Sequence, residues 1–228
     1  SKCHHCHSTI AWRDNIPLLA YLYLRGKCRS CGEKISLRYP AIEISTALVF
    51  AASGFFLEKC SPLLQSPLCS WSSSLGFWVY PFLIILSSIM IGIFIIDLET
   101  KIIPDELSLT GCLLVFVFLI LAKASYLAYL LSGLGTALFL LLIHLVTGGK
   151  GMGLGDVKLA LFLGAFLGWP YSMIWLFLSF VIGAVVGTVL IVVGKAKFGR
   201  QIPFGPFLIF SAFLVLFFAK YFVGILPF

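Results

Sequence analysis

Seven apolar stretches, each close in length to a helix that crosses a lipid bilayer, dominate the sequence from residue 41 onward. A hydrocarbon core about 30 Å thick is crossed by roughly 20 residues of α-helix, which satisfies its own backbone hydrogen bonds there. The stretches lie at residues 41–57, 76–97, 106–122, 127–146, 156–169, 172–193 and 205–222. The sequence therefore predicts an all-α polytopic membrane protein with about seven transmembrane helices, whose main partner is the lipid bilayer.

Composition leads to the same class of protein. Hydrophobic residues make up 61% of the 228 residues and charged residues 11%, against about 45–50% and about 25% in an ordinary soluble domain. So few polar side chains cannot cover a globule with a water-facing surface. This composition excludes a soluble globule, and it equally excludes a disordered chain, a collagen or a coiled coil.

The net charge of +7 comes from 16 lysines and arginines, seven of which precede residue 40. Basic residues collect in the cytoplasmic loops of membrane proteins. If the N-terminal region is cytoplasmic, the seven predicted spans place twelve basic residues on that face and three on the other. The charge thus indicates a multi-pass orientation with residues 1–40 in the cytoplasm, and no nucleic-acid partner is expected.

Residues 1–40 contain two cysteine pairs, Cys3-x-x-Cys6 and Cys28-x-x-Cys31, separated by 21 residues. This spacing is typical of structural zinc sites, in which two such turns supply four thiolates. Disulfides are the alternative, but they fit poorly with a cytoplasmic location. We predict a small zinc-binding module at residues 1–40, with a closed metal shell that stabilises the fold, followed by a transmembrane domain at residues 41–228.

A third pair of cysteines, Cys60 and Cys69, lies in the loop between the first two predicted spans. The predicted orientation places this loop outside the cytoplasm, where a disulfide can form. Two free thiols near the interface are equally compatible with the spacing, so both interpretations stay open.

Two aspartates are expected at the same depth and on the same face of the membrane. Asp97 follows the apolar run 91–96, and Asp156 follows the glycine-rich segment 151–155. Two neighbouring carboxylates can share one proton, which provides an acid and a base in one site. Such a pair suffices for peptide hydrolysis without a metal ion or a covalent nucleophile.

Other roles for the two aspartates remain open on the residues alone. Asp156 is also placed to cap a helix, and Asp97 to pair with Lys101 one turn further on. Carboxylates inside membranes also mark ion pathways. His144, within the fourth predicted span, is expected to be a neutral histidine that forms a structural hydrogen bond.

Several blocks of sequence, taken in order, resemble a known family. Gly153-Leu-Gly-Asp156 matches the G-x-G-D motif of intramembrane aspartyl proteases, and the segment from Asp97 to Asp105 resembles their partner motif. Further similarities are Asn15-Ile-Pro17, Leu24-Arg-Gly-Lys-Cys28-Arg-Ser-Cys31, Ile35-Ser-Leu-Arg-Tyr-Pro40 and Ile202-Pro-Phe-Gly-Pro206. Together they resemble the bacterial type IV prepilin peptidases.

The resemblance implies a peptidase of the bacterial inner membrane. It would cleave the basic leader of type IV prepilins and type II secretion pseudopilins at the cytoplasmic face. Many members then methylate the new N-terminus with S-adenosylmethionine. By position, Asp97 and Asp156 would be catalytic, Gly153 and Gly155 would shape the adjoining loop, and the zinc ligands would be Cys3, Cys6, Cys28 and Cys31. The family pattern also implies a further membrane segment before the first cysteine pair.

Two other functions remain as alternatives. A proton- or metal-coupled transporter would use Asp97 and Asp156 to bind its ion. A non-enzymatic membrane scaffold would use the zinc module to dock a cytoplasmic partner.

Overall fold

The computed structural model describes residues 2–3, 5–58, 71, 75–122, 126–194 and 202–223, with side chains described as far as residue 218. The chain divides into two compact units, Ser1–Ala52 and Ser53–Phe228. Regular structure in the described residues is helical, apart from two isolated antiparallel bridges in the first unit. The predicted all-α class is confirmed.

The first unit contains the short helices η1 (Trp12–Asn15) and α1 (Leu19–Tyr23) and the first part of α2 (Arg38–Glu58). Neither short helix contains a buried residue. A segment of this size with so little apolar burial needs another source of stability, such as a metal ion.

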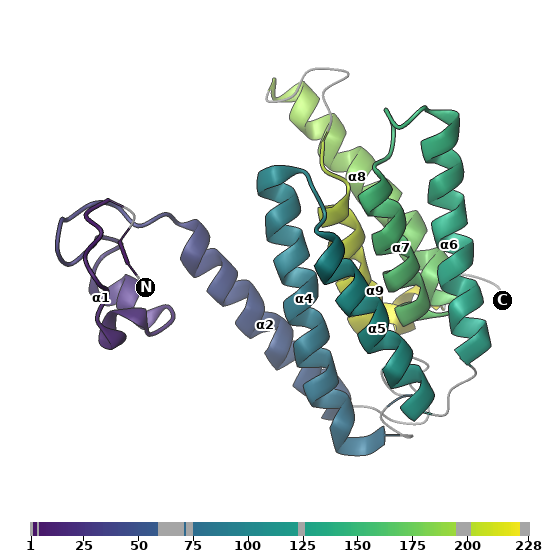
Figure 1. The fold of residues 1–228 in the computed structure, drawn as a ribbon, viewed down its shortest axis with the longest axis horizontal. Coiled ribbons are helices and arrows are strands. Elements are labelled where there is room, and N and C mark those ends of the chain that lie inside the picture. The colour runs from purple at the N-terminus through teal and green to yellow at the C-terminus, as the bar shows by residue number, and fades with distance from the viewer. Residues whose placement is uncertain are drawn as a thin grey trace. The chain divides into compact units, whose positions relative to one another are not determined.

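The second unit is a helical bundle (Figure 1). Its described elements are η2 (Gly76–Trp78), α4 (Val79–Thr100), α5 (Asp105–Leu121), α6 (Tyr126–Val146), α7 (Leu154–Leu167), α8 (Tyr171–Val192) and α9 (Gly205–Val223). Helix α7 contacts α5, α6, α8 and α9, and thus lies at the centre of the bundle.

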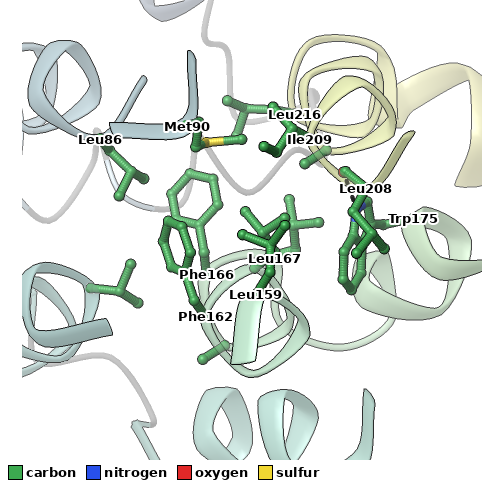
Figure 2. Close-up of a cluster of buried hydrophobic side chains, with 14 of the residues drawn as sticks. Leu86, Met90, Leu159, Phe162, Phe166, Leu167, Trp175, Leu208, Ile209 and Leu216 are labelled. Atoms are coloured by element: carbon green, nitrogen blue, oxygen red, sulfur yellow. Dashed lines mark hydrogen bonds between the residues drawn. The ribbon is translucent and has the colours of Figure 1, made fainter. Parts of the chain in front are cut away.

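Helix α7 supplies much of the hydrophobic core of this unit. Figure 2 shows Leu159, Phe162 and Phe166 of α7 beside Met90 of α4 and Leu208 of α9. All five side chains are buried. Nine of the 14 residues of α7 are buried, so its apolar character reflects protein packing more than contact with lipid.

The contact between α6 and α7 depends on small residues. A Cβ atom added to Gly133 would lie 2.6 Å from the carbonyl oxygen of Leu161, and one added to Gly164 would overlap the hydroxyl of Thr136. That hydroxyl donates a hydrogen bond to the carbonyl of Ala160 across the interface at 3.1 Å. Close approach of backbones at small residues is the usual way in which membrane helices associate.

Each of the seven predicted stretches falls on a helix. Among the described residues, four helices are long and apolar enough to cross a membrane: Arg38–Glu58, Gly76–Thr100, Tyr126–Val146 and Tyr171–Val192. Helices α5 and α7 contain 17 and 14 residues, and the apolar helix Gly205–Phe218 is also shorter. The chain is an integral, multi-pass membrane protein, and the total of about seven spans stays a prediction.

Candidate active site and candidate zinc centre

Asp97 lies in the last turn of α4 and is 3% exposed. The helix ends three residues later at Thr100, because Lys101 adopts the left-handed conformation and donates its N–H to the carbonyl of Asp97 at 2.9 Å. The Oδ2 atom of the Asp97 carboxylate is buried and has no hydrogen-bond partner among the described residues. A buried carboxylate oxygen in this state is costly, which is typical of functional sites.

The backbone of Gly205, at the start of α9, packs directly against this carboxylate. A Cβ atom at Gly205 would overlap Oδ2 of Asp97 and would lie 3.2 Å from Cδ1 of Ile103. Ile103 is itself buried and lies 3.0 Å from the position of a Cβ on Gly155. Ile103 therefore separates the first turns of α7 and α9 beside Asp97, and glycine is needed on both helices.

Asp156 is the third residue of α7 and is 8% exposed. Its Oδ2 accepts a hydrogen bond from the backbone N–H of Gly153 at 3.1 Å. This contact caps the helix, as one of the alternatives for Asp156 anticipated. A capping bond occupies one carboxylate oxygen and leaves the other available for a second role.

The fold places the two aspartates, from distant segments of the chain, near the same set of contacts. The negative charge of Asp97 acts on the Asp156 carboxylate, and Ile103 packs against Gly155, the neighbour of Asp156, and against Gly205, which touches Asp97. Figure 1 shows the helices that carry them, α4 and α7, in the same bundle. The end of α4 and the starts of α7 and α9 thus meet around Ile103, with one buried aspartate on α4 and one on α7.

The loop that precedes Asp156 is fixed by α6. His144 forms a 2.6 Å hydrogen bond through Nδ1 to the carbonyl oxygen of Met152, and the backbone N–H of Gly151 donates to the hydroxyl of Thr147 at 3.1 Å. Because a carbonyl only accepts, Nδ1 is the protonated nitrogen of His144. The expected structural hydrogen bond of this histidine is confirmed.

Sequence reasoning did not assign Ile103 or Gly205 to the site. The Gly-Pro pair at 205–206 signals only the start of a helix, and nothing local indicates that this helix starts against Asp97. The pair Lys158 and Asp105 was also not anticipated: Lys158 Nζ lies 2.7 Å from Asp105 Oδ1 and links α7 to α5. Both side chains are about half exposed, so the bridge contributes little to stability.

In the first unit, the Sγ atoms of Cys3, Cys6, Cys28 and Cys31 all lie within 4.8 Å of one another. The Sγ atoms of Cys3 and Cys31 are 4.0 Å apart. Zinc with four thiolates at about 2.3 Å forms a tetrahedron whose edges are about 3.8 Å. All four cysteines are free thiols, so the donor set fits zinc, whereas disulfides are not present among them.

The two cysteine turns have the same backbone structure. The N–H of Cys3 donates to the carbonyl of Ser8, and the N–H of Cys28 donates to that of Glu33, at 3.0 and 2.8 Å. The residue after each second cysteine is left-handed, with φ of 55° at His7 and 72° at Gly32. Each turn directs two thiols toward the same point, as a shared metal ion requires.

The thiol of Cys6 is prepared for metal binding by its neighbour. Hydrogen bonds with the hydroxyl of Ser8, 3.0 Å away, and with the Ser8 backbone lower the pKa of Cys6 from 9.0 to about 6. This thiol is therefore largely deprotonated at neutral pH, and the thiolate is the form that binds zinc. No described histidine joins the cluster. His4, Cys60 and Cys69 lie outside the described residues, so the disulfide between the last two stays a prediction.

Replacing one zinc ligand should remove the metal and destabilise the first unit. We expect the purified protein to hold about one zinc ion per chain and Cys28→Ser to hold far less, because structural zinc supplies roughly 10–16 kcal/mol to folding in small modules. Elemental analysis measures the metal, and limited proteolysis of residues 1–40 measures the fold. Cys112→Ser, on α5, is the control and should keep its zinc. A zinc-free wild-type protein with four titratable thiols in this cluster would contradict the site.

Comparison with known proteins assigns the chain. Residues 1–56 match the bacterial peptidase A24 N-terminal domain, and residues 83–188 match the type IV leader peptidase family. A prepilin leader peptidase/N-methyltransferase of Stutzerimonas stutzeri is 36% identical over 225 residues, which cover 95% of this chain and 71% of that protein. The chain belongs to the type IV leader peptidase family. The family predicted from the motifs is confirmed.

Other relatives of the family give a similar comparison. The prepilin leader peptidase/N-methyltransferase of Aeromonas hydrophila is 35% identical over 222 residues, covering 95% of this chain and 70% of that protein. The one from Legionella pneumophila is 33% identical over 225 residues, with coverage of 95% and 71%. No solved structure matches the chain. The first family match contains the four clustered cysteines, and the second contains both Asp97 and Asp156.

Proposed function

We propose that this chain is a bacterial inner-membrane aspartyl endopeptidase that removes the leader of type IV prepilins, with Asp97 and Asp156 as its catalytic pair. The observation that carries the proposal is the presence of two buried and electrostatically coupled carboxylates, at the end of α4 and the start of α7, one of which keeps an unpartnered oxygen among the described residues. The names of the family relatives supply the substrate class. Pseudopilins of type II secretion, which share the basic leader and apolar stem, are proposed as further substrates.

The chemistry requires one proton shared between the two carboxyl groups. The ionised carboxylate takes a proton from water, and the hydroxide oxygen attacks the scissile carbonyl carbon while the protonated carboxyl donates to the carbonyl oxygen. The tetrahedral intermediate then breaks its C–N bond: the first carboxyl gives its proton to the leaving amine nitrogen, and the second takes a proton from a hydroxyl of the intermediate as the new carboxyl group forms. Water is thereby added across the peptide bond, and the pair returns to its starting protonation state.

We propose that cleavage takes place at the cytoplasmic side. The basic residues of the first unit favour that face for residues 1–40. A substrate with a basic leader and an apolar stem helix would lie with its stem in the bilayer and its leader in the cytoplasm. The scissile bond would then reach the depth at which α4 ends and α7 begins.

The proposed architecture has a four-cysteine zinc module at residues 1–40 and a transmembrane protease domain at residues 41–228. In this arrangement the zinc ion stabilises the module, because four thiolates leave no coordination position for a reacting water. Gly153 and Gly155 are proposed to shape the loop beside the pair. Gly153 supplies the N–H that binds Asp156, and Gly155 allows Ile103 to approach α7.

Methylation of the new N-terminus is proposed from the names of the relatives. S-adenosylmethionine would supply the methyl group as a carbon bound to its sulfonium sulfur. No binding site for this donor is identified among the described residues.

Incubation of the zinc-loaded protein with a model prepilin tests the proposal. We expect mass spectrometry to show a mature pilin that lacks its leader, and the product made with S-adenosylmethionine to carry the additional mass of one methyl group. Omitting S-adenosylmethionine should leave cleavage intact. An uncleaved prepilin under conditions in which the protein is folded would contradict the peptidase, and proton or metal flux through the protein in vesicles would favour the transporter.

A further inference from the structure

The first unit exposes an unusual set of apolar side chains on its surface. Trp12, Leu19 and Tyr23 are 75%, 66% and 78% exposed, and Ile16 is also exposed. These four residues and Arg13 line one concavity of about 780 Å³, together with Asp14 and Arg29. We call the surface formed by Trp12, Arg13, Ile16, Leu19 and Tyr23 the module face. A contiguous apolar surface of this kind marks an interaction site.

A hydrogen bond fixes the module face close to the start of a predicted span. The backbone N–H of Leu18 donates to Oε2 of Glu43 on α2 at 2.8 Å. Leu18 has φ of 59° and ψ of −47°, a conformation that a residue with a side chain rarely adopts. The contact therefore holds the chain just before α1 in one position against α2.

The length of α2 sets the depth of this contact in the membrane. Its 21 residues rise about 31 Å, close to the thickness of the hydrocarbon core. The predicted span begins at residue 41, so the first residues of α2 precede it, and Glu43 lies only about 3 Å into the span. Leu18 is hydrogen-bonded to Glu43, so Leu19, the next residue and a member of the module face, lies close to the level at which α2 enters the membrane.

The chemistry of the face suits an anionic headgroup layer. Tryptophan and tyrosine prefer the membrane interface, and arginine binds phosphate through several N–H groups. Residues 1–52 contain seven basic and three acidic residues, and a zinc ion with four thiolates contributes a charge of −2, so the zinc-loaded unit carries a net charge of +2. This charge repels the basic leader of a prepilin, which argues against the substrate as occupant of the face.

The cations beside the face differ in their availability. The guanidinium of Arg29 lies over the ring of Tyr23 and is paired with both carboxylate oxygens of Asp14, at 2.8 and 2.6 Å. Arg13, whose guanidinium lies over the ring of Trp12, is exposed, and no ion pair of Arg13 is found in the described part of the chain. Arg13 is thus the residue of the face best placed to meet a lipid phosphate.

We propose that the module face is a membrane-docking surface that binds anionic phospholipid headgroups and holds the first unit against the bilayer. Trp12 and Leu19 enter the interface, and Arg13 contacts a phosphate. The hydrogen bond from Leu18 to Glu43 aligns the face with the membrane. The surface is separate from the Asp97 and Asp156 pair, which belongs to the other unit.

Fluorescence of Trp12 in the full-length, zinc-loaded protein tests this proposal. The protein is placed in nanodiscs of phosphatidylcholine with and without phosphatidylglycerol, and the difference between wild type and Trp12→Phe isolates the emission of Trp12 from the other four tryptophans. Lipids brominated near the headgroup should quench Trp12 strongly in the anionic discs and much less in the neutral ones. Acrylamide should quench it less in anionic discs than in detergent.

Charge variants test the role of Arg13. One basic residue near an anionic membrane contributes about fivefold to association, so Arg13→Gln should lower the ratio of docked to free module about fivefold in anionic discs. Lys2→Gln removes the same charge from an exposed residue outside the face and should have a smaller effect. In Asp97→Asn, brominated lipid should quench Trp12 fluorescence as strongly as in wild type, because docking does not depend on peptidase activity.

Two results would overturn the proposal. In the first, acrylamide quenches Trp12 equally in anionic discs and in detergent, and brominated lipid does not quench it. This result would show that the face stays in water or binds another protein. Equal lipid quenching with and without phosphatidylglycerol would show that anionic headgroups are not recognised.

Discussion

Asp97→Asn and Asp156→Asn should each abolish leader cleavage, with a loss of at least about 1,000-fold in rate, while the protein keeps its fold and its zinc. Acid–base catalysis by a positioned side chain contributes roughly 10²–10⁴-fold, and asparagine, which is nearly the same size, cannot exchange a proton with water. Cleavage of a model prepilin, followed by mass spectrometry, measures the loss, and thermal unfolding checks the fold.

Asparagine at position 156 also separates catalysis from helix capping. Its side-chain oxygen can still accept the N–H of Gly153, as the Asp156 carboxylate does at 3.1 Å. If Asp156 serves only to cap α7, the variant should stay active. Asp105→Asn is the matched control. It removes an exposed bridge to Lys158 that is worth at most about 1 kcal/mol, so it should cleave nearly as well as wild type.

The two alternatives predict other outcomes. A transporter would lose ion flux in the Asp97 and Asp156 variants, and a scaffold would lose neither flux nor its partner. Normal cleavage by either asparagine variant would refute the aspartyl mechanism directly.

Gly205→Ala should lower cleavage at least about 100-fold. The added methyl group would overlap Oδ2 of Asp97 and approach Ile103 at 3.2 Å, so the carboxylate must move. A shift of about 1 Å in a catalytic group commonly costs 10²-fold in rate. Steady-state kinetics should show the loss mainly in kcat, because the methyl group acts on the position of the Asp97 carboxylate.

Gly135→Ala is the control for this experiment. Gly135 lies within α6, and a Cβ atom there would find nothing within 4 Å among the described residues. Alanine should therefore be accepted, and helix propensity favours it by up to about 1 kcal/mol. Full activity of Gly205→Ala would contradict the importance of the close contact with Asp97, provided that thermal unfolding shows both variants to be as stable as wild type.

The cluster of four cysteines is the part of the protein that local sequence predicts best. Each C-x-x-C turn brings its own two thiols together, so Cys3 with Cys6 and Cys28 with Cys31 need only one long-range contact to complete the cluster. The helices could be predicted equally well, because long runs of apolar residues indicate segments that are shielded from water. Such runs do not distinguish lipid from protein, however. The apolar residues of α7 are largely buried inside the bundle, and this helix does not extend to the end of the predicted span at 156–169.

The surroundings of the aspartates were less predictable. Asp97 and Asp156 could be singled out because a carboxylate beside an apolar run is costly. Their neighbours depend on contacts between segments far apart in the chain. Ile103 meets Gly155 and Gly205 only once α4, α7 and α9 have packed, and a single sequence carries no signal for such a contact.

The short length of helix α7 affects how water, the second reactant in peptide hydrolysis, reaches the site inside the membrane. Fourteen residues of α-helix rise about 21 Å, roughly 9 Å less than the hydrocarbon thickness. At least one terminus of α7 must then sit beneath the headgroup plane, and polar backbone groups there attract hydration. If the hydrated membrane surface is locally lowered above the Gly153 end of α7, water reaches Asp156 without a permanent channel through the bundle.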